Sequence, residues 1–171
     1  QLMELYFNSV GRGSVLLLNA TPDTTGLIPA SHVQRYKDFG ETIRRYFDNP
    51  LAKTAGKSTQ LQCTLDAPAD VNCIMLQEDL MKGQRITSYQ VEGSLDGNKW
   101  EVLCKGTSVG NKKIDRFATR KVKLVRLVVN RSKATPCVEN FSVFCLPEEA
   151  IQTVSSEDAP VTVSAWEYTT Y

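Results

Sequence analysis

The polar residues best suited to bind a ligand lie in one short stretch, QEDLMKGQR, which contains Glu78, Asp79 and Arg85. Planar polar side chains of these types can bond two adjacent hydroxyl groups, which is the polar half of a carbohydrate-binding site. The other half is an aromatic face for a pyranose ring, and no exposed aromatic residue is evident beside this stretch. Two hypotheses therefore stay open: a sugar site, or a salt-bridged loop packed against a neighbouring domain.

A second polar pair, Asn19 and Asp23, comes after an unbroken apolar run at residues 15–18. Such a run, closed by a loop rich in Pro, Asp and Gly, predicts a strand buried on both faces, as in parallel sheets. The pair would then lie at the carboxyl end of a strand, where α/β barrels build their active sites. These residues either line the rim of a substrate pocket or bond to their own backbone to shape the turn before Gly26.

Composition argues against several other kinds of chemistry. The chain has 20 Lys and Arg against 19 Asp and Glu, so we expect binding neither to nucleic acid nor to a membrane. The basic residues between positions 112 and 131 are interpreted as the solvated face of edge strands. With one histidine, His32, and no CxxC pair, we expect no metal site and no cofactor. The five cysteines are interpreted as small buried apolar residues rather than disulfides.

The first 49 residues are predicted to form a helix, a strand and a second helix. Gly11 and Gly13 are suited to end the first helix, the strand covers residues 14–19, and Ser31 can cap the second helix. A strand covered on both faces needs neighbouring strands, and this unit supplies one strand only. We therefore predict that residues 1–49 close a (β/α)₈ barrel whose other strands precede Gln1.

Residues 50–146 have a different period, with short segments rich in β-branched and aromatic residues. Seven such segments predict a mainly β fold, a β-sandwich of jelly-roll type. A change of apolar parity between Leu124 and Val125 predicts a β-bulge. Residues 147–171 are predicted to be either one more strand or a disordered tail. The seven segments span residues 61–65, 71–77, 85–94, 99–104, 114–117, 122–129 and 138–146.

Two long stretches carry a specific resemblance to a known family. The run SVGRGSVLLLNATPDTTGLIPASHVQRYKDFGETIRRYF resembles the end of the catalytic barrel in α-L-fucosidases of glycoside hydrolase family 29. The second stretch, with TLDAP, CIMLQEDLMKGQRITSYQVEG, WEVLCKGTSVGNKKIDRF and VRLVV, is similar to the discoidin-like β-sandwich carried after that barrel. The resemblance covers about residues 2–146 and rests on the two patterns in tandem.

The resemblance implies a retaining exo-glycosidase that removes terminal α-L-fucose from glycans. Such chemistry needs two carboxyl groups about 5 to 5.5 Å apart, one as nucleophile and one as general acid and base. In the family both precede the last barrel unit, so we expect them upstream of Gln1, with no catalytic residue in this chain. The expected partners are a fucosylated glycan and the remainder of the barrel.

Two further expectations concern location and alternatives. The family and three Asn-x-Ser/Thr sequons, at Asn19, Asn130 and Asn140, favour a secreted, periplasmic or lysosomal protein. The chief alternative function is a non-catalytic carbohydrate-binding module of discoidin type. However, the Asp-Gly-x-x-x-Thr-x-Trp stretch of full-length discoidin modules is absent between Lys53 and Leu61. A purely structural interdomain or dimerisation domain is the third hypothesis.

Overall fold

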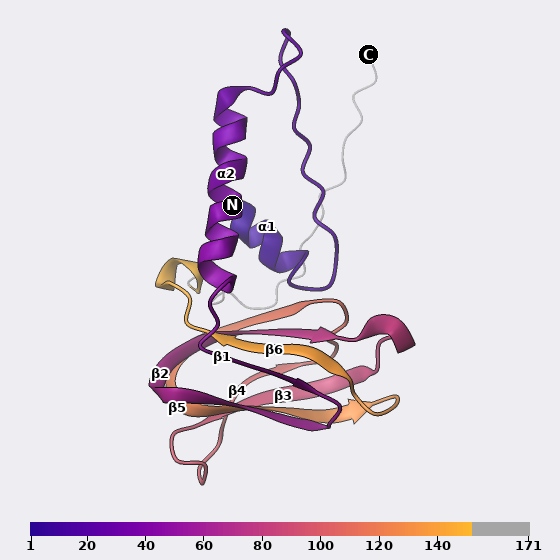
Figure 1. The fold of residues 1–171 in the computed structure, drawn as a ribbon, viewed down its shortest axis with the longest axis vertical. Coiled ribbons are helices and arrows are strands. Elements are labelled where there is room, and N and C mark those ends of the chain that lie inside the picture. The colour runs from indigo at the N-terminus through magenta and orange to yellow at the C-terminus, as the bar shows by residue number, and fades with distance from the viewer. Residues whose placement is uncertain (152–171) are drawn as a thin grey trace, which may run out of the picture.

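The computed structural model describes residues 1–151, so the part of the predicted strand or tail of residues 147–171 that begins at residue 152 lies outside the described residues. Two helices precede a sheet that makes up the lower half of the molecule in Figure 1. Helix α1 covers Leu2–Asn8 and helix α2 covers Ala30–Phe47, while the short helices η1 and η2 cover Leu80–Lys82 and Glu148–Ala150. The strands are β1 Ala52–Gly56, β2 Gln60–Glu78, β3 Ile86–Ser94, β4 Glu101–Gly106, β5 Lys113–Ser132 and β6 Val138–Phe144.

The strands form one antiparallel sheet in the order β1-β6-β2-β5-β3-β4. Strands β2 and β5 are long and bend, so the sheet folds over into two layers around a common core (Figure 1). This mainly β sandwich confirms the predicted fold class of residues 50–146. Each long strand had been predicted as two short ones, because the polar residues at its bend look like a loop in the sequence. Strand β1 was not predicted.

The core of the sandwich is built from side chains of both layers. Its fully buried members include Ile74 and Leu76 of β2, Val91 of β3, and Leu127 of β5. Each such side chain contributes roughly 1.5–3 kcal/mol relative to exposure. The buried positions of β5 change from even-numbered (Val122) to odd-numbered (Val125 onward), as predicted. The register shift nevertheless lies between Val122 and Leu124, opposite residues 64–69 of β2, and not between Leu124 and Val125.

The predicted strand at residues 14–19 is not formed, which corrects the sequence interpretation. These residues run extended beside α2 without any strand pairing, because no neighbouring strand in the described residues offers them hydrogen bonds (Figure 1). Val15 and Leu17 are 90% and 83% exposed, whereas Leu16 packs on the apolar cluster beneath the helices. The predicted Ser31 cap is also wrong. Helix α2 begins at Ala30 after Pro29, whose φ of −53° already suits a helix start.

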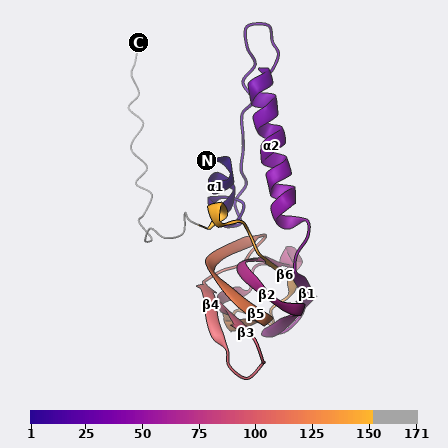
Figure 2. The same cartoon turned by 90° about the vertical axis from the view of Figure 1, so that its left-hand side faces the viewer.

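The helices rest on the outer face of the layer that contains β6. Here Cys73 and Met75 of β2 and Phe144 of β6 join Tyr6 and Phe47 of the helices in a second apolar cluster. The rings of Phe47 and Phe144 meet edge to face with centroids 5.3 Å apart. Figure 2 shows α1 and the lower end of α2 on this one face of the sandwich. No helix among residues 1–151 is long and apolar enough to cross a membrane.

Candidate functional site

The contact between the helices and the sandwich, which we call the seam, is fixed by Arg116 of β5. Its guanidinium donates to both carboxylate oxygens of Glu4 at 2.9 and 3.1 Å, and to the carbonyl oxygen of Ala150 at 2.7 Å. The same group lies over the ring of Phe7, 4.0 Å from its centroid. Because charge-assisted hydrogen bonds are about twice as strong as neutral ones, this largely buried arginine holds α1 in one orientation.

Gly11 forms the second fixed point of the seam. Its carbonyl oxygen accepts the N–H of Ile114 at 2.8 Å, and the next residue, Arg12, forms a β-bridge with Lys113. A Cβ at Gly11 would lie 2.5 Å from the carbonyl oxygen of Phe7, so only glycine fits between α1 and β5. The turn that leads into residues 14–20 is thereby tied to the sandwich.

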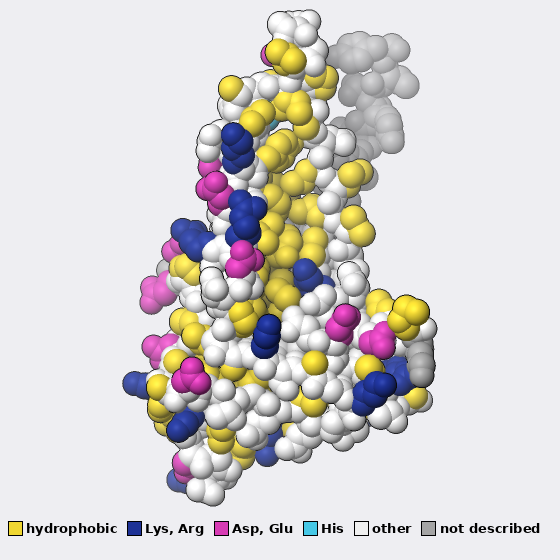
Figure 3. Space-filling model, viewed as in Figure 1, with side chains coloured by type: hydrophobic (Ala, Val, Ile, Leu, Met, Phe, Trp, Pro, Cys, Tyr) yellow, Lys and Arg dark blue, Asp and Glu magenta, His cyan; other side chains and the backbone are white. Residues whose placement is uncertain are grey.

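Above the seam the molecule presents an open apolar face. Figure 3 shows hydrophobic side chains gathered in a stripe between α2 and the segment that precedes it. Monomeric proteins rarely expose contiguous apolar surface of this kind unless it meets a partner. The exposed large apolar side chains of residues 14–33 are those of Val15, Leu17, Leu27, Ile28 and Val33.

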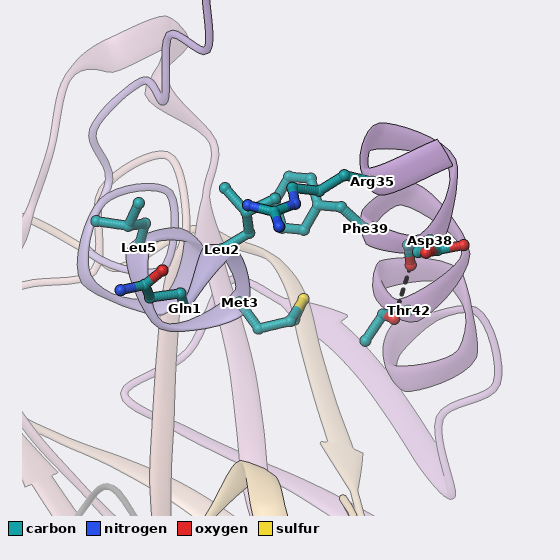
Figure 4. A pocket seen from close by; sticks show the side chains of 8 residues that line it. All are labelled: Gln1, Leu2, Met3, Leu5, Arg35, Asp38, Phe39 and Thr42. Atoms are coloured by element: carbon teal, nitrogen blue, oxygen red, sulfur yellow. Dashed lines mark hydrogen bonds between the residues drawn. The ribbon is translucent and has the colours of Figure 1, made fainter. Parts of the chain in front are cut away.

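A cavity of about 440 Å³ lies between α1 and α2. Figure 4 shows Leu2 and Met3 of α1 opposite Phe39 of α2, with the Arg35 side chain extended from α2 toward Leu2 and with Asp38 at the margin. The Asp38 carboxylate accepts the side-chain N–H of Gln34, on the same helix, at 2.7 Å. A single carboxylate beside apolar groups lacks the paired carboxyl groups of a glycosidase, so the cavity is a gap in helix packing. Nor do residues 1–151 contain a cluster of side chains able to hold a metal ion.

Asn19 and Asp23 lie in the exposed segment that leads to the far end of α2. The Asp23 carboxylate accepts the hydroxyl and the backbone N–H of Thr25 at 2.6 and 2.8 Å, and these bonds lower the pKa of Asp23. The carbonyl oxygen of Asn19 accepts the hydroxyl of Tyr36 at 2.7 Å. In this chain the Asp23 side chain therefore shapes its own turn, and both residues remain accessible.

Glu78, Asp79 and Arg85 are brought together in one loop at the end of β2. The buried Glu78 carboxylate accepts the backbone N–H groups of Arg85, Ile86 and Gly110, each at 3.0 Å. Asp79 caps η1 by accepting the N–H of Met81 at 3.0 Å. The Arg85 guanidinium donates to the carbonyl oxygen of Thr135 at 2.6 Å, so all three side chains bond to backbone. We call this loop the Glu78 loop.

Among residues 1–151, the aromatic side chain considered as a stacking surface for a sugar ring is that of Trp100, which follows the Asp96-Gly97 turn. The Asp96 carboxylate accepts the N–H groups of Asn98 and Lys99, as expected of a tight turn. The Arg126 guanidinium lies over the Trp100 ring, 3.9 Å from its centroid, and also pairs with Glu92 at 2.5 Å. One face of the ring is therefore occupied by a residue of the chain itself.

Sequence reasoning missed both fixed points of the seam. Arg116 belongs to the run of basic residues that were interpreted as solvated, although its side chain is largely buried. Its position two residues after the buried Ile114 predicts that it shares a face with Ile114, yet nothing local predicts a partner 112 positions away. Gly11 was assigned only a role in ending the first helix, because its contact with β5 joins residues far apart in the sequence and no local pattern predicts it.

Comparison with known protein families supports an assignment for the sandwich. The model of the F5/8 type C domain matches residues 40–140. The chain is 28% identical over 180 residues to α-L-fucosidase 1 of Arabidopsis thaliana, a match that covers 84% of this chain and 36% of the relative.

Similarity to solved structures also points to glycoside hydrolases. One assigned as an α-L-fucosidase of Bacteroides thetaiotaomicron VPI-5482 is 42% identical with a TM-score of 0.83, covering 85% of this chain and 34% of that one. A glycoside hydrolase 29 family member from an unknown rumen bacterium is 28% identical with a TM-score of 0.76, covering 93% and 29%. The chain thus spans about a third of the length of these relatives.

Proposed function

Given that the chain belongs to the F5/8 type C domain family and is homologous to α-L-fucosidases, we propose that it forms the carboxy-terminal part of a retaining α-L-fucosidase. Its sandwich is then the ancillary domain. Residues 1–49 are the last unit of the catalytic barrel, and residues 50–146 are the sandwich that supports it.

The observation that carries this proposal is the exposure of Val15 and Leu17 in an apolar run that suits a doubly buried strand. Leu16, between them, packs on the helices, so the two exposed side chains face the opposite direction. Further barrel strands beside residues 14–20 would supply both the missing hydrogen bonds and the missing cover. Relatives about three times longer than this chain have room for them.

The chemistry of the complete enzyme derives from its class. One carboxylate attacks the anomeric carbon of a terminal α-L-fucosyl residue while a second carboxyl group protonates the leaving oxygen, and water then releases the sugar. Both groups are assigned to the barrel strands before residue 1. The substrate is a fucosylated glycan, and the protein acts outside the cytoplasm.

Within this chain, Asn19 and Asp23 are assigned to the rim of the pocket. This assignment is supported by their place after the last strand segment, since barrels build active sites at the carboxyl ends of their strands. Glu78, Asp79 and Arg85 are assigned to the boundary between barrel and sandwich. This assignment is supported by their bonds to backbone, which fix the shape of the loop.

The proposal is tested with 4-nitrophenyl α-L-fucoside as the substrate. The longest polypeptide encoded by the gene and the 171-residue chain are purified and assayed side by side. We expect release of nitrophenol by the longer polypeptide and none by the chain. An inert longer polypeptide that nevertheless binds fucosylated glycans would favour a non-catalytic binding module and contradict the proposal.

A further inference from the structure

The direction of the chain shows which side of the proposed barrel meets the sandwich. Gly11 and Arg12, just before the strand segment, are bonded to Ile114 and Lys113 of β5. From there residues 14–20 run away from the sandwich toward the far end of α2 (Figure 1). The amino end of the strand segment is thus at the sandwich and its carboxyl end is remote. Because barrels hold their active sites at the carboxyl ends of the strands, the sandwich lies beneath the opposite, amino-terminal face.

A second apolar feature projects from the sandwich on this side. Strand β2 passes under the helices with Cys73 and Met75, and then continues into the Glu78 loop and η1. From Met75 to the end of the strand at Glu78 the chain advances about 10 Å, at about 3.3 Å per residue, before the Glu78 loop begins. Figure 1 shows η1 at the edge of the layer that carries the helices, on the same side of α2 as residues 14–20.

Helix η1 begins with two large apolar side chains that are exposed. Leu80 is 43% exposed and Met81 is 90% exposed, although the loop that carries them is firmly held. Three hydrogen bonds to the Glu78 carboxylate close the loop at its base, the Asp79 side chain caps η1, and the Asp79 N–H donates to the carbonyl oxygen of Cys137. Rigid presentation of apolar side chains lowers the entropic cost of a contact.

We propose that Leu80 and Met81 are a docking contact for the amino-terminal face of the catalytic barrel. This inference rests on the proposed function and names a second contact besides the seam. The occupant is identified by direction. The next α/β unit, placed against the exposed Val15 and Leu17, would lie on the side of α2 on which η1 projects. The missing two thirds of the relatives' length supplies that unit.

The test compares two double variants in the complete enzyme and in the 171-residue chain. Leu80→Gln with Met81→Gln removes the proposed contact. Leu95→Gln with Val102→Gln is the matched control, because these side chains are 55% and 48% exposed on the β3–β4 hairpin, away from the helices. We expect the first pair to lower the Tm of the complete enzyme by about 2–4 °C and the control pair by under about 1 °C. In the 171-residue chain both pairs should behave alike.

Two outcomes would overturn the inference. Equal Tm values for the two double variants in the complete enzyme would show that nothing packs on η1. A changed KM for the fucoside at unchanged Tm would place Leu80 and Met81 at the active site instead. Failure of the proposed function appears separately, as a complete polypeptide without fucosidase activity, and the Tm comparison still reports on docking.

Alkylation gives a second measurement that does not depend on stability. In a Cys145→Ser background, Met81→Cys should react with iodoacetamide at least tenfold more slowly in the complete enzyme than in the 171-residue chain. Equal rates in the two proteins would contradict docking.

Discussion

The Arg116 guanidinium forms two hydrogen bonds with the Glu4 carboxylate, across 112 positions of the sequence. Arg116 belongs to the sandwich and Glu4 to the first helix, so the bonds join two parts of the chain with different structural periods. Together with the Gly11 contact, they make the seam a specific junction and not merely an apolar contact.

Arg116→Met should destabilise the chain by about 1.5–3 kcal/mol, because the Ala150 carbonyl oxygen and the Glu4 carboxylate lose a charged partner while the apolar stem is kept. Arg120→Met is the control, since Arg120 is exposed on the same strand. Urea unfolding measured by circular dichroism compares both. Equal free energies of unfolding for the two variants would show that the seam does not depend on Arg116.

Two glycines offer a test of the close approach at the seam. Gly11→Ala should cost about 1–3 kcal/mol or more, because the new Cβ would lie 2.5 Å from the Phe7 carbonyl oxygen. Gly40→Ala should stabilise the chain by about 0.5–1 kcal/mol, since Gly40 is inside α2 and the atom nearest to a new Cβ is 3.7 Å away, at the flexible end of the Arg44 side chain. Thermal unfolding of both variants gives the signs, and a neutral Gly11→Ala would disprove the close packing.

Glu78→Gln should loosen the loop that carries η1. An amide has one acceptor oxygen, so at least one of the three backbone N–H groups loses its partner and the free energy of unfolding falls by about 1–3 kcal/mol. Glu139→Gln, on the exposed side of β6, is the control. Hydrogen exchange at Ile86 and Gly110 should accelerate only in Glu78→Gln. Unchanged exchange at both amides would show that the carboxylate does not hold the loop.

The cysteines predict a graded reactivity toward alkylating agents. All five are free thiols. Cys63 and Cys73 are buried as expected, whereas Cys104 and Cys137 are half-buried and Cys145 is exposed, contrary to the expectation of general burial. Burial raises the pKa of Cys63 to about 12, so its thiolate is scarce at pH 8 and we expect Cys145 to react first. Because the folded pKa of Cys63 exceeds the unfolded value of about 8.5, the contribution of this thiol to stability is present below about pH 8.5. It declines as the pH rises toward about 12. Mass spectrometry of partly alkylated protein checks the order, and rapid labelling of Cys63 in the folded chain would contradict it.

Helices and strands with a clear pattern of residue types in their own short segment were predicted from the sequence. Short segments rich in β-branched and aromatic residues located β3, β4 and β6, and the helical spacing of Leu2, Leu5 and Tyr6 located α1. Strands β2 and β5 were each split in two because their bends, around residues 66–70 and 118–121, carry polar and small residues that resemble loops. Strand β1 was missed because AKTAG has little β-branched character, and its pairing with β6 is tertiary.

The candidate site was only partly accessible to sequence reasoning. The Glu78 loop was found as a polar cluster, but its dependence on backbone N–H groups of residues 85, 86 and 110 arises from the fold alone. At residues 15–18 the sequence has the composition of a buried strand, and the structure leaves that segment unpaired. The composition of a segment predicts whether it suits a buried or an exposed environment. It does not predict which other segments of the polypeptide provide that environment.

Our central claim is that residues 14–20 are a barrel strand whose neighbours belong to the rest of an α-L-fucosidase. Hydrogen exchange detected by mass spectrometry tests it directly, by comparing peptides over these residues in the 171-residue chain and in the complete protein. We expect exchange within seconds in the chain and protection by at least a hundredfold in the complete protein. Rapid exchange in both, or protection already in the chain, would contradict the claim.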